Sequence, residues 1–532
     1  MKFRLPFFLS VLAILILWQA FSSLAANPII FPSPAATFKR LAELCAELFF
    51  WRGVLFSVLR VFSAFFLVLL FGGAAGIFCG IFPFFRAFMA FPLAAIRSVP
   101  VVSFILLAIF AFKSDFVPVF SAFLMGFPMM TSAVSSGFAF GEDDKKLFFM
   151  ADVFGLKNSQ KIRFILLPKL KPFLESGIFS VFGMCWKVVA AAEVLSVPKN
   201  AAGAILQNAQ VHLESAEVLA ATIVLVALSF FFERILRLIF NAVCSSFSSL
   251  NANFSGRFLT PFGRAIRGSA NATFLRSTPL RSGTRLRRAA TIPNAMQAAQ
   301  EVKIKNLTIK FGGKVLFKDF SITFGGGKTT AILAPSGGGK TTLLNWIAKD
   351  FLKKPRRRGQ SAKPPVSFLF QEPRLLTTLT VFENVFLPLS NIFPKKDAAE
   401  LAERFLDASG LSDKKERTTE NLSGGEKQRV AMARAFAFPS QILLLDEAFQ
   451  SLDEKIKLSL EETLKKLLKE NPRTVIFAAH QKDEAENLAD RIVEMDSCPL
   501  KIVSEMTISE TAVSETAVSE TQQGSANFQK LW

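Results

Sequence analysis

Six long runs of apolar residues in the first 240 positions constrain the fold of this 532-residue chain more than any other feature. The runs cover about 5–24, 54–82, 87–111, 116–140, 173–195 and 218–240. A helix crosses the hydrocarbon core of a bilayer with about 20 residues, because each residue rises 1.5 Å. Each run is long enough, so the sequence predicts an all-α membrane domain with about six transmembrane helices.

The flanking charges predict the orientation of these spans. Six crossings leave both ends of the domain on one side, and Arg234, Arg237 and the basic stretch after them indicate that this side is cytoplasmic. Lys2 and Arg4 agree with this orientation. A cleaved signal peptide ending near SSLAAN is the alternative for the first run. That run is longer than a usual signal core, so we expect an uncleaved anchor.

The stretch 242–300 is expected to be a basic, flexible linker. It is rich in Ser, Asn, Ala and Arg, with eight Arg and no Asp or Glu. Such a charge attracts anionic lipid headgroups at about 1 kcal/mol per basic residue near the surface. The stretch has no nucleic-acid-binding motif, so we expect membrane lipids and no nucleic acid as its partner. The repeat SETAVSETAVSET at 509–521 predicts a low-complexity tail over 506–532.

Residues 301–505 change to an α/β pattern. VKIKNLTIKF alternates as a strand does, and KTTAILA, PVSFLF, QILLLDE and RTVIFAAH are apolar enough for buried strands. Helical stretches separate them. The chain has 60 Phe and no Tyr, so no mechanism in it can use a phenol.

The motif GGGKTT occurs twice in this domain, at 325–330 and again at 337–342. A phosphate-binding loop follows a strand and ends at a helix N-terminus, where backbone N–H groups and the helix dipole attract the anion. Only the second copy has a strand before it and a helical stretch, 341–351, after it. We therefore expect Lys340 to hold phosphate and Gly325–Gly327 to form a tight turn between strands.

One position departs from the phosphate-loop pattern G-x-x-x-x-G-K-[ST]. The first glycine of that pattern is Ala334 here. An alanine would crowd the loop if the position needs a positive φ. The rest of the loop, PSGGGKTT, is intact, so we expect nucleotide binding to survive.

Four further motifs accompany the loop. FLFQEPRLL stands at 368–376, LSGGEKQRVAMARA at 422–435 and ILLLDEAFQSLDE at 442–454, and VIFAAH ends at His480. In this order and spacing they resemble the ATPase domain of ABC transporters over about 301–500. The resemblance implies an α/β P-loop NTPase domain that binds ATP and Mg²⁺.

The resemblance also implies roles for single residues. Glu447 would polarise the attacking water, Gln371 would touch that water and Mg²⁺, and His480 would contact the γ-phosphate. The metal ligands would be Thr341, Gln371 and Asp446. The nucleotide contacts would be Phe311 (stacked on adenine), Ser336, Gly337, Gly338, Gly339, Lys340, Thr341, Thr342, Ser423, Gly424, Gly425 and Asp453.

The signature loop, Ser423 to Gly425, caps the ATP of a second ATPase domain in this family. The chain has one such domain, so the resemblance implies a homodimer or a pair with a related half-transporter.

A charged loop at 141–172 predicts the direction of transport. Its segment FMADVFGLKNSQKIRFILLP resembles the coupling loop of binding-protein-dependent importer permeases, although Phe149 stands where that motif has Glu. The resemblance implies a short helix-turn-helix that docks on the ATPase near Gln371. Gly155 would permit the turn, and Pro168 would break the helix before the fifth span.

Two membrane segments, 95–112 and 190–210, resemble permeases of the nitrate, sulfonate, taurine and thiamine-precursor importer group. The implied domains are a permease over 1–241, the linker 242–300, the ATPase 301–505 and the tail 506–532. The implied function is ATP-driven import of a small solute across the bacterial cytoplasmic (inner) membrane, with a cytoplasmic ATPase. A periplasmic or lipid-anchored substrate-binding protein would deliver the solute.

Two alternatives stay open. An ABC exporter half would usually carry long cytoplasmic helical extensions, which the sequence does not predict. A membrane regulator that hydrolyses ATP without transport is a second alternative. Three charged residues in the apolar runs, Arg97, Lys187 and Glu193, are expected to be paired or to lie near helix ends.

Overall fold

The computed structural model describes residues 4–25, 27, 29–267, 299–311, 314–335, 337–353, 366–448, 454–470, 472–479, 481–496 and 499–508. The chain divides into two compact units. The first comprises Met1–Phe140 and Lys169–Asn271, and the second comprises Gly141–Pro168 and Ala272–Trp532. The loop 141–168 therefore belongs to the unit of the ATPase domain, although the sequence places it inside the predicted permease domain.

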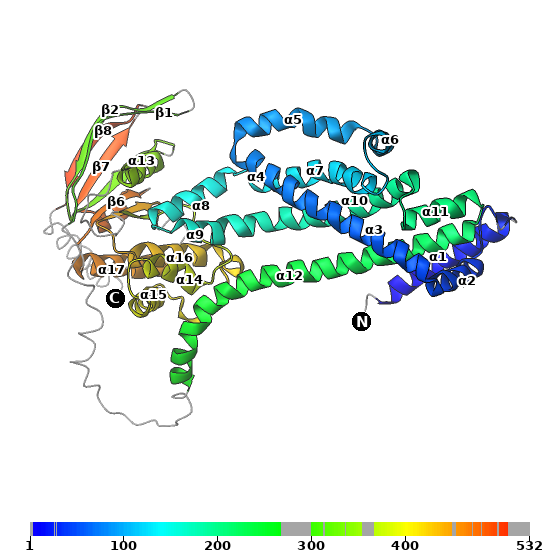
Figure 1. Cartoon of the computed structure of the whole chain (residues 1–532). Helices are drawn as coiled ribbons and strands as arrows, with labels where there is room; N and C mark the ends of the chain where they lie inside the picture. Colours follow the sequence, from blue (N-terminus) through cyan, green and yellow to red (C-terminus); the bar gives the residue numbers. More distant parts are fainter. Residues whose placement is uncertain are drawn as a thin grey trace, which may run out of the picture. The chain divides into compact units, whose positions relative to one another are not determined.

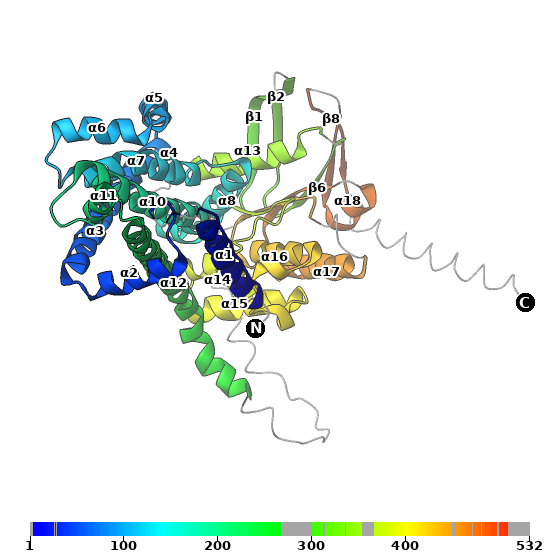
Figure 2. The same ribbon diagram turned by 90° about the vertical axis from the view of Figure 1, so that its right-hand side faces the viewer.

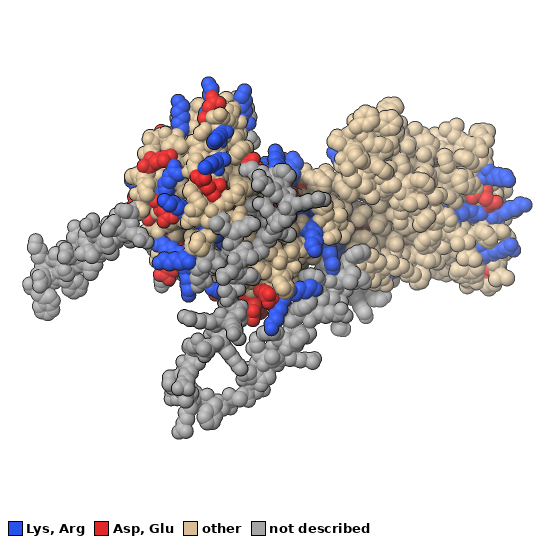
Figure 3. Space-filling model, turned by 60° about the vertical axis from the view of Figure 1, so that its left-hand side comes forward, with Lys and Arg blue, Asp and Glu red and all other residues tan. Residues whose placement is uncertain are grey.

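The first unit is helical, as predicted (Figure 1). Its helices are α1 (Arg4–Ala25), α2 (Pro34–Ala46), α3 (Leu48–Leu67), α4 (Gly73–Ile81), α5 (Pro83–Ser98), α6 (Val101–Ala111), α7 (Val117–Gly137), α10 (Leu167–Ser196), α11 (Ala202–Val211) and α12 (Ser215–Arg267). A π-helical turn at Val68–Gly72 joins α3 to α4. On the face shown in Figure 3, most of the surface of this unit carries no charge, and one group of charged side chains lies at an end of the unit.

Fewer helices than the predicted six meet the length and hydropathy of a membrane span in the described residues. Four do: Leu48–Ile81, Val117–Gly137, Asn158–Ser196 and Ser215–Ser245. The third apolar run is broken, because α5 and α6 meet at 97° and count as a fifth span only if taken together. Pro100 explains the break, since proline has no N–H and restricts the residue before it. The first run contributes the shorter apolar helix Leu9–Leu24.

The last span continues further than expected. Helix α12 runs to Arg267, so helix occupies the first part of the predicted linker 242–300, whose residues 268–298 lie outside the described ones. No Pro or Gly stands between 242 and 255 to end the helix, which explains the error. This extension also weakens the sequence argument against an exporter, which rested on the absence of long helical extensions.

Small residues let the helices of the first unit pack closely. A Cβ on Gly76 of α4 would lie 2.6 Å from the Cβ of Val134 in α7. A Cβ on Gly126 of α7 would lie 2.8 Å from a methyl group of Val68. Small residues at helix contacts are typical of membrane bundles, where close packing replaces the hydrophobic effect.

Two of the three charged residues in the apolar runs are paired. Glu193 is fully buried, and its carboxylate accepts from Arg60 at 2.9 Å and from the hydroxyl of Ser57 at 2.6 Å. Arg97 donates to the carbonyl of Pro128 at 2.8 Å. Lys187 is exposed on α10. Glu193 and Arg97 thus follow the expectation of pairing, whereas Lys187 lies in the interior of α10 rather than near a helix end.

The second unit contains a six-stranded sheet in the order β4-β5-β6-β3-β7-β8. Its strands are β3 (Thr329–Leu333), β4 (Val366–Leu369), β5 (Ile442–Asp446), β6 (Thr474–Ala479), β7 (Arg491–Asp496) and β8 (Lys501–Thr507). β8 runs antiparallel to β7, and the other neighbours are parallel. A separate antiparallel pair is formed by β1 (Val302–Phe311) and β2 (Lys314–Phe324). The predicted α/β class is confirmed.

The helices of this unit are α8 (Glu142–Val153), α9 (Asn158–Lys161), α13 (Lys340–Lys353), α14 (Val381–Ser390), α15 (Lys395–Ala408), α16 (Gly424–Ala437), α17 (Glu454–Glu470) and α18 (Lys482–Leu488). Helices α14, α15 and α16 pack against one another (Figure 2). Because parallel strands present their carboxyl ends at one edge, the residues after β3 and after β5 lie at the same edge of the sheet, on either side of β6.

The loop 141–168 forms the predicted helix-turn-helix from α8 and α9. Gly155 lies between them with φ of +64°, a conformation that favours glycine. Pro168 does not break the helix, contrary to the prediction. It lies in the first turn of α10, after a π-helical turn at Ile162–Leu166, and the helix is continuous over Asn158–Ser196. The π-helical turn just before Pro168 changes the hydrogen-bonding pattern there, which lets the helix continue past the missing N–H of the proline.

Candidate nucleotide-binding site

The second glycine run forms a tight loop between β3 and α13, as predicted. Gly337 and Gly339 have φ of +78° and +92°, and a Cβ on Gly338 would lie 2.8 Å from the carbonyl oxygen of Pro335. Helix α13 begins at Lys340, so its free N–H groups and its dipole face this loop. The geometry suits a bound phosphate and requires glycine at these positions.

Lys340 is held inside the loop. Its side chain is 6% exposed, and its ammonium group donates to the carbonyl of Ala334 at 2.6 Å. Ala334 is absent from the described non-glycine residues with positive φ. The alanine that departs from the motif therefore introduces no backbone strain at its position, and its carbonyl helps to orient the lysine.

The first glycine run is a turn between β2 and β3, which confirms the sequence interpretation. Gly327 has φ of +74°, and the N–H of Lys328 donates to the carbonyl of Gly325 at 3.3 Å. The N–H of Gly327 also donates to the hydroxyl of Thr474 at 3.1 Å. No helix begins after this turn, because β3 follows directly.

A carboxylate and a hydroxyl meet beside the phosphate loop. Asp446 ends β5 and is 1% exposed, and the hydroxyl of Thr341 donates to it at 3.0 Å. Burial raises the pKa of Asp446 to about 6, and the neighbouring Glu447 also raises it, whereas Thr341 lowers it. Both groups offer the hard oxygen atoms that Mg²⁺ prefers. Among the described residues, this buried carboxylate accepts its hydrogen bond from the neutral hydroxyl of Thr341, so the carboxylate fits this ion.

Glu447 and Gln371 also come together. The amide of Gln371 donates to the carboxylate of Glu447 at 2.6 Å. Glu447 follows β5 with φ of +49°, an uncommon conformation for a residue with a side chain. The structure thus brings four predicted residues into two hydrogen-bonded pairs, Thr341 with Asp446 and Gln371 with Glu447. The two carboxylates are neighbours in the sequence.

The signature loop caps helix α16. Ser423 is the N-cap, and its hydroxyl accepts from the N–H of Glu426 at 3.3 Å, while Glu426 accepts from the N–H of Ser423 at 2.7 Å. A hydrogen bond from Lys414, with the Ser423 N–H, holds the pKa of Glu426 at about 2. Gly424 and Gly425 form the first turn of the helix.

Several predicted nucleotide contacts cannot be placed. Ser336, Asp453 and His480 lie outside the described residues. Phe311 ends β1, where it pairs with Lys314, but its side chain is not described. Thr342 lies in the first turn of α13.

The loop 141–168 packs on the ATPase part of the second unit close to Gln371. Lys146 forms an ion pair with Glu372 at 2.9 Å. The ring of Phe149 lies 5.8 Å from that of Phe370, and the ammonium of Lys349 lies 5.5 Å from the Phe149 ring. Phe149 thus makes aromatic and cation–π contacts at the position where the motif has a glutamate.

Further along the loop, Gln160 exchanges two hydrogen bonds with Asn391. The Gln160 amide donates at 3.1 Å, and the Asn391 amide donates back at 2.9 Å. The predicted docking of this loop near Gln371 therefore has direct contacts at both of its helices.

The sequence analysis missed two residues at the contact between this loop and α16, one from each side. Phe154 and Arg434 are both buried, and the guanidinium of Arg434 lies 4.9 Å from the Phe154 ring. The only sequence signal was an arginine among small and apolar residues in AMARAFAF, which is an unusual position for a charge.

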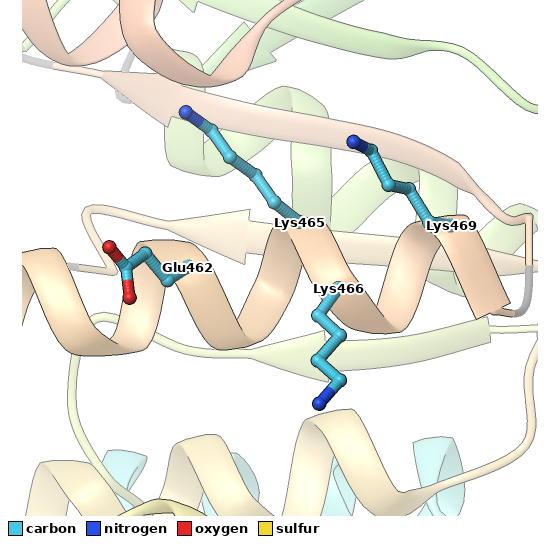
Figure 4. A pocket seen from close by; sticks show the side chains of 4 residues that line it. All are labelled: Glu462, Lys465, Lys466 and Lys469. Atoms are coloured by element: carbon cyan, nitrogen blue, oxygen red, sulfur yellow. The ribbon is translucent and has the colours of Figure 1, made fainter.

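A shallow depression on the surface of α17 does not have the features of a binding site. It lies along α17 and is lined by Glu462, Lys465, Lys466 and Lys469 (Figure 4). In Figure 4, Lys465 and Lys469 point to one side of the helix and Lys466 to the other. These side chains are exposed or partly so, which is typical of a solvated helix face rather than a built site.

Comparison with known proteins also indicates an ABC transporter ATPase. The ABC transporter family model matches residues 317–450. The chain is 37% identical over 194 residues to the aliphatic sulfonates import ATP-binding protein SsuB 1 of Paracoccus denitrificans, covering 36% of this chain and 78% of that protein. It is 38% identical over 210 residues to the sulfate/thiosulfate import ATP-binding protein CysA 1 of Chromobacterium violaceum, covering 37% of this chain and 58% of that protein.

A solved structure, the dimeric ATP-binding cassette MJ0796 bound to ADP and Pi, is 28% identical with a TM-score of 0.34. It covers 40% of this chain and 99% of that chain. The fold and the nucleotide site define an ATP-binding cassette. The chain belongs to the ABC transporter family, and it is an ATP hydrolase whose helical unit carries the features of a membrane protein.

Proposed function

We propose that this chain is a permease and an ATPase in one polypeptide and that it imports a small solute across the bacterial cytoplasmic membrane. The observation that carries the proposal is the packing of the loop 141–168 on the ATPase beside Gln371. The similarity to import ATP-binding proteins supports the inward direction. The solute itself is left open, because the similar proteins act on different ones.

The chemistry follows from the chain's own groups. The loop Gly337–Gly339 and Lys340 would hold the β- and γ-phosphates, and Thr341, Asp446 and Gln371 would hold Mg²⁺. Bound Mg²⁺ supplies positive charge that offsets the charge developing on the transferred phosphoryl group. Glu447, oriented by the amide of Gln371, would accept a hydrogen bond from the attacking water and polarise it.

Ser336, His480, Asp453 and Phe311 keep their predicted roles in this proposal. Ser423, Gly424 and Gly425 would close over the nucleotide of a second ATPase domain, so two chains, or this chain and a related half, would be required. The N-terminus of α16, with its cap already in place, offers free N–H groups to an anion.

The partners follow from the importer class. A periplasmic or lipid-anchored binding protein would deliver the solute to the helical unit, and Gly155 would keep the turn of the coupling loop. Exposed apolar residues such as Phe84, Phe91 and Phe110 would contact membrane lipids. An exporter half remains the second candidate, because α12 extends far beyond the length that a bilayer needs.

Hydrolysis by the purified chain in nanodiscs tests the proposal. The measurement compares ATP turnover with and without a candidate solute-binding protein. An importer is expected to hydrolyse ATP faster with the binding protein, and Glu447→Gln is expected to abolish both rates. Turnover that is stimulated by the solute alone, without any binding protein, would favour the exporter.

A further inference from the structure

Arg434 is a charged residue in an unusual place. It lies near the C-terminal end of α16 and is 2% exposed. Its described contacts are two carbonyl groups and an aromatic ring, so it is a buried cation that no described ion pair neutralises. A buried charge is costly, and an apolar side chain at such a position is often as stable or more so. Fold stability alone therefore does not explain the arginine.

One face of the Arg434 guanidinium meets the loop 141–168. The guanidinium carbon lies 4.9 Å from the centroid of the Phe154 ring. Phe154, which precedes the turn at Gly155, is 1% exposed and packs edge-on against Phe438 at 5.1 Å. Phe154 thus lies between Arg434 of α16 and Phe438, the residue that follows this helix, so a displacement of Phe154 would act on the guanidinium of Arg434.

The N–H groups of Arg434 reach the segment after Gln371. They donate to the carbonyl of Arg374 at 3.0 Å and to that of Pro373 at 2.9 Å. Arg374 has φ of +42°, and its own guanidinium lies 3.9 Å from the centroid of the Phe370 ring. The segment that carries Gln371 is therefore held on both sides of that residue.

We propose that Arg434 is the positioning residue through which the loop 141–168 sets the place of Gln371 and, through it, of Glu447. The chain of contacts is continuous: Phe154 to Arg434, Arg434 to the carbonyls of Pro373 and Arg374, and Gln371 to Glu447 at 2.6 Å. Arg434 itself touches neither nucleotide nor water. The proposal rests on the proposed role of residues 141–168 as the coupling loop.

The arginine is suited to this task by its shape. Its planar group offers several N–H donors at fixed angles together with a flat face for a ring, whereas the ammonium of a lysine offers one point of charge. Burial, with Arg374 nearby, lowers the pKa of Arg434 to about 9, so the group is still charged near neutral pH. Lysine keeps the positive charge but lacks the planar group with several N–H donors, which makes Arg434→Lys the informative variant.

The experiment measures ATP hydrolysis by the full chain in nanodiscs, with no solute and no binding protein. The variants are Arg434→Lys, Phe154→Leu and the double variant, with Arg429→Lys as the matched control. Arg429 lies on the same helix and donates to the carbonyls of Ser409 and Gly410, away from the loop. Hydrolysis does not depend on the direction of transport, so a wrong importer assignment leaves this test intact.

Arg434→Lys is expected to lower kcat about tenfold, the factor that corresponds to one lost hydrogen bond from a charged group, with KM for ATP within about twofold. Phe154→Leu is expected to lower kcat in the same way, and the double variant no further than the more impaired single one. Arg429→Lys is expected to keep the kcat of the unmodified chain.

Three results would overturn the proposal. The first is an unchanged kcat in Arg434→Lys with the melting temperature preserved. The second is a double variant in which the two losses multiply, because independent effects exclude a shared path. A loss of kcat that tracks the melting temperature across all variants would also overturn it, since that outcome assigns Arg434 a structural role only.

Discussion

Replacing Asp446 by asparagine tests the electrostatics of the nucleotide site. The carboxylate lies at the end of β5 with 1% of its surface exposed. Its pKa is raised from 3.8 to about 6, first by burial. Asparagine has the shape of the protonated acid and cannot ionise, so it removes the cost of a buried negative charge without opening a cavity.

The magnitude and the sign of the expected change in unfolding free energy follow from this shift in pKa. The folded chain binds the proton more tightly than the unfolded chain, so the stability linked to it is complete below pH 3.8 and is lost as the pH rises through about 6. A shift of about 2 pKa units corresponds to about 3 kcal/mol. At pH 7.5 the Asp446→Asn chain should therefore be more stable than the unmodified chain by up to this amount, and at pH 4 the difference should fall to about 0.6 kcal/mol.

The assay is thermal unfolding of the full chain in detergent without nucleotide at both pH values. For the ATPase domain, about 3 kcal/mol corresponds to a rise in melting temperature of roughly 6 °C or more. Asp397→Asn, at an exposed position of α15, is the control for a generic loss of charge. A difference between Asp446→Asn and the unmodified chain that is the same at pH 4 and pH 7.5 would refute the reasoning.

Three further substitutions test single assignments. Glu447→Gln should retain ATP and stop turnover, and normal phosphate release by this variant would refute the assigned base. Lys340→Ala should abolish hydrolysis while Lys328→Ala leaves it nearly unchanged, and equal losses would contradict the choice between the glycine runs. Gly155→Val forces a branched residue to φ of +64°, at a cost of roughly 1–2 kcal/mol. It should reduce solute uptake per ATP hydrolysed, and an unchanged ratio would remove Gly155 from the coupling loop.

Local context made the nucleotide loop predictable. A strand followed by glycines and a helix can be recognised from a few consecutive residues, and that context alone distinguished Lys340 from Lys328. The turn at Gly155 could be predicted for the same reason, since only the backbone of a glycine reaches its φ without strain.

The sequence analysis was wrong about helix ends and breaks that depend on the neighbouring structure. Pro168 was expected to break a helix, but a π-helical turn before it lets the helix continue. The start of the linker at 242 was predicted from composition, whereas no helix breaker ends α12 there. The break at Pro100 divided a run that hydropathy alone counted as one span.

The contacts of the coupling loop could not be foreseen. Phe149 departs from the importer motif, and nothing local shows that its ring meets Phe370 and Lys349. Arg434 and Phe154 lie 280 positions apart in the sequence, and only the folded unit brings them together. Such tertiary contacts leave no periodic pattern in the sequence.

Uptake by proteoliposomes tests most directly whether ATP hydrolysis by this chain moves a solute inward. The vesicles carry ATP and Mg²⁺ in the lumen, with the ATPase facing inward and the solute-binding protein with labelled solute outside. The account predicts accumulation of label in the lumen that requires the binding protein and is lost in Glu447→Gln. In matched vesicles loaded with both ATP and labelled solute, loss of label from the lumen without any binding protein would contradict it.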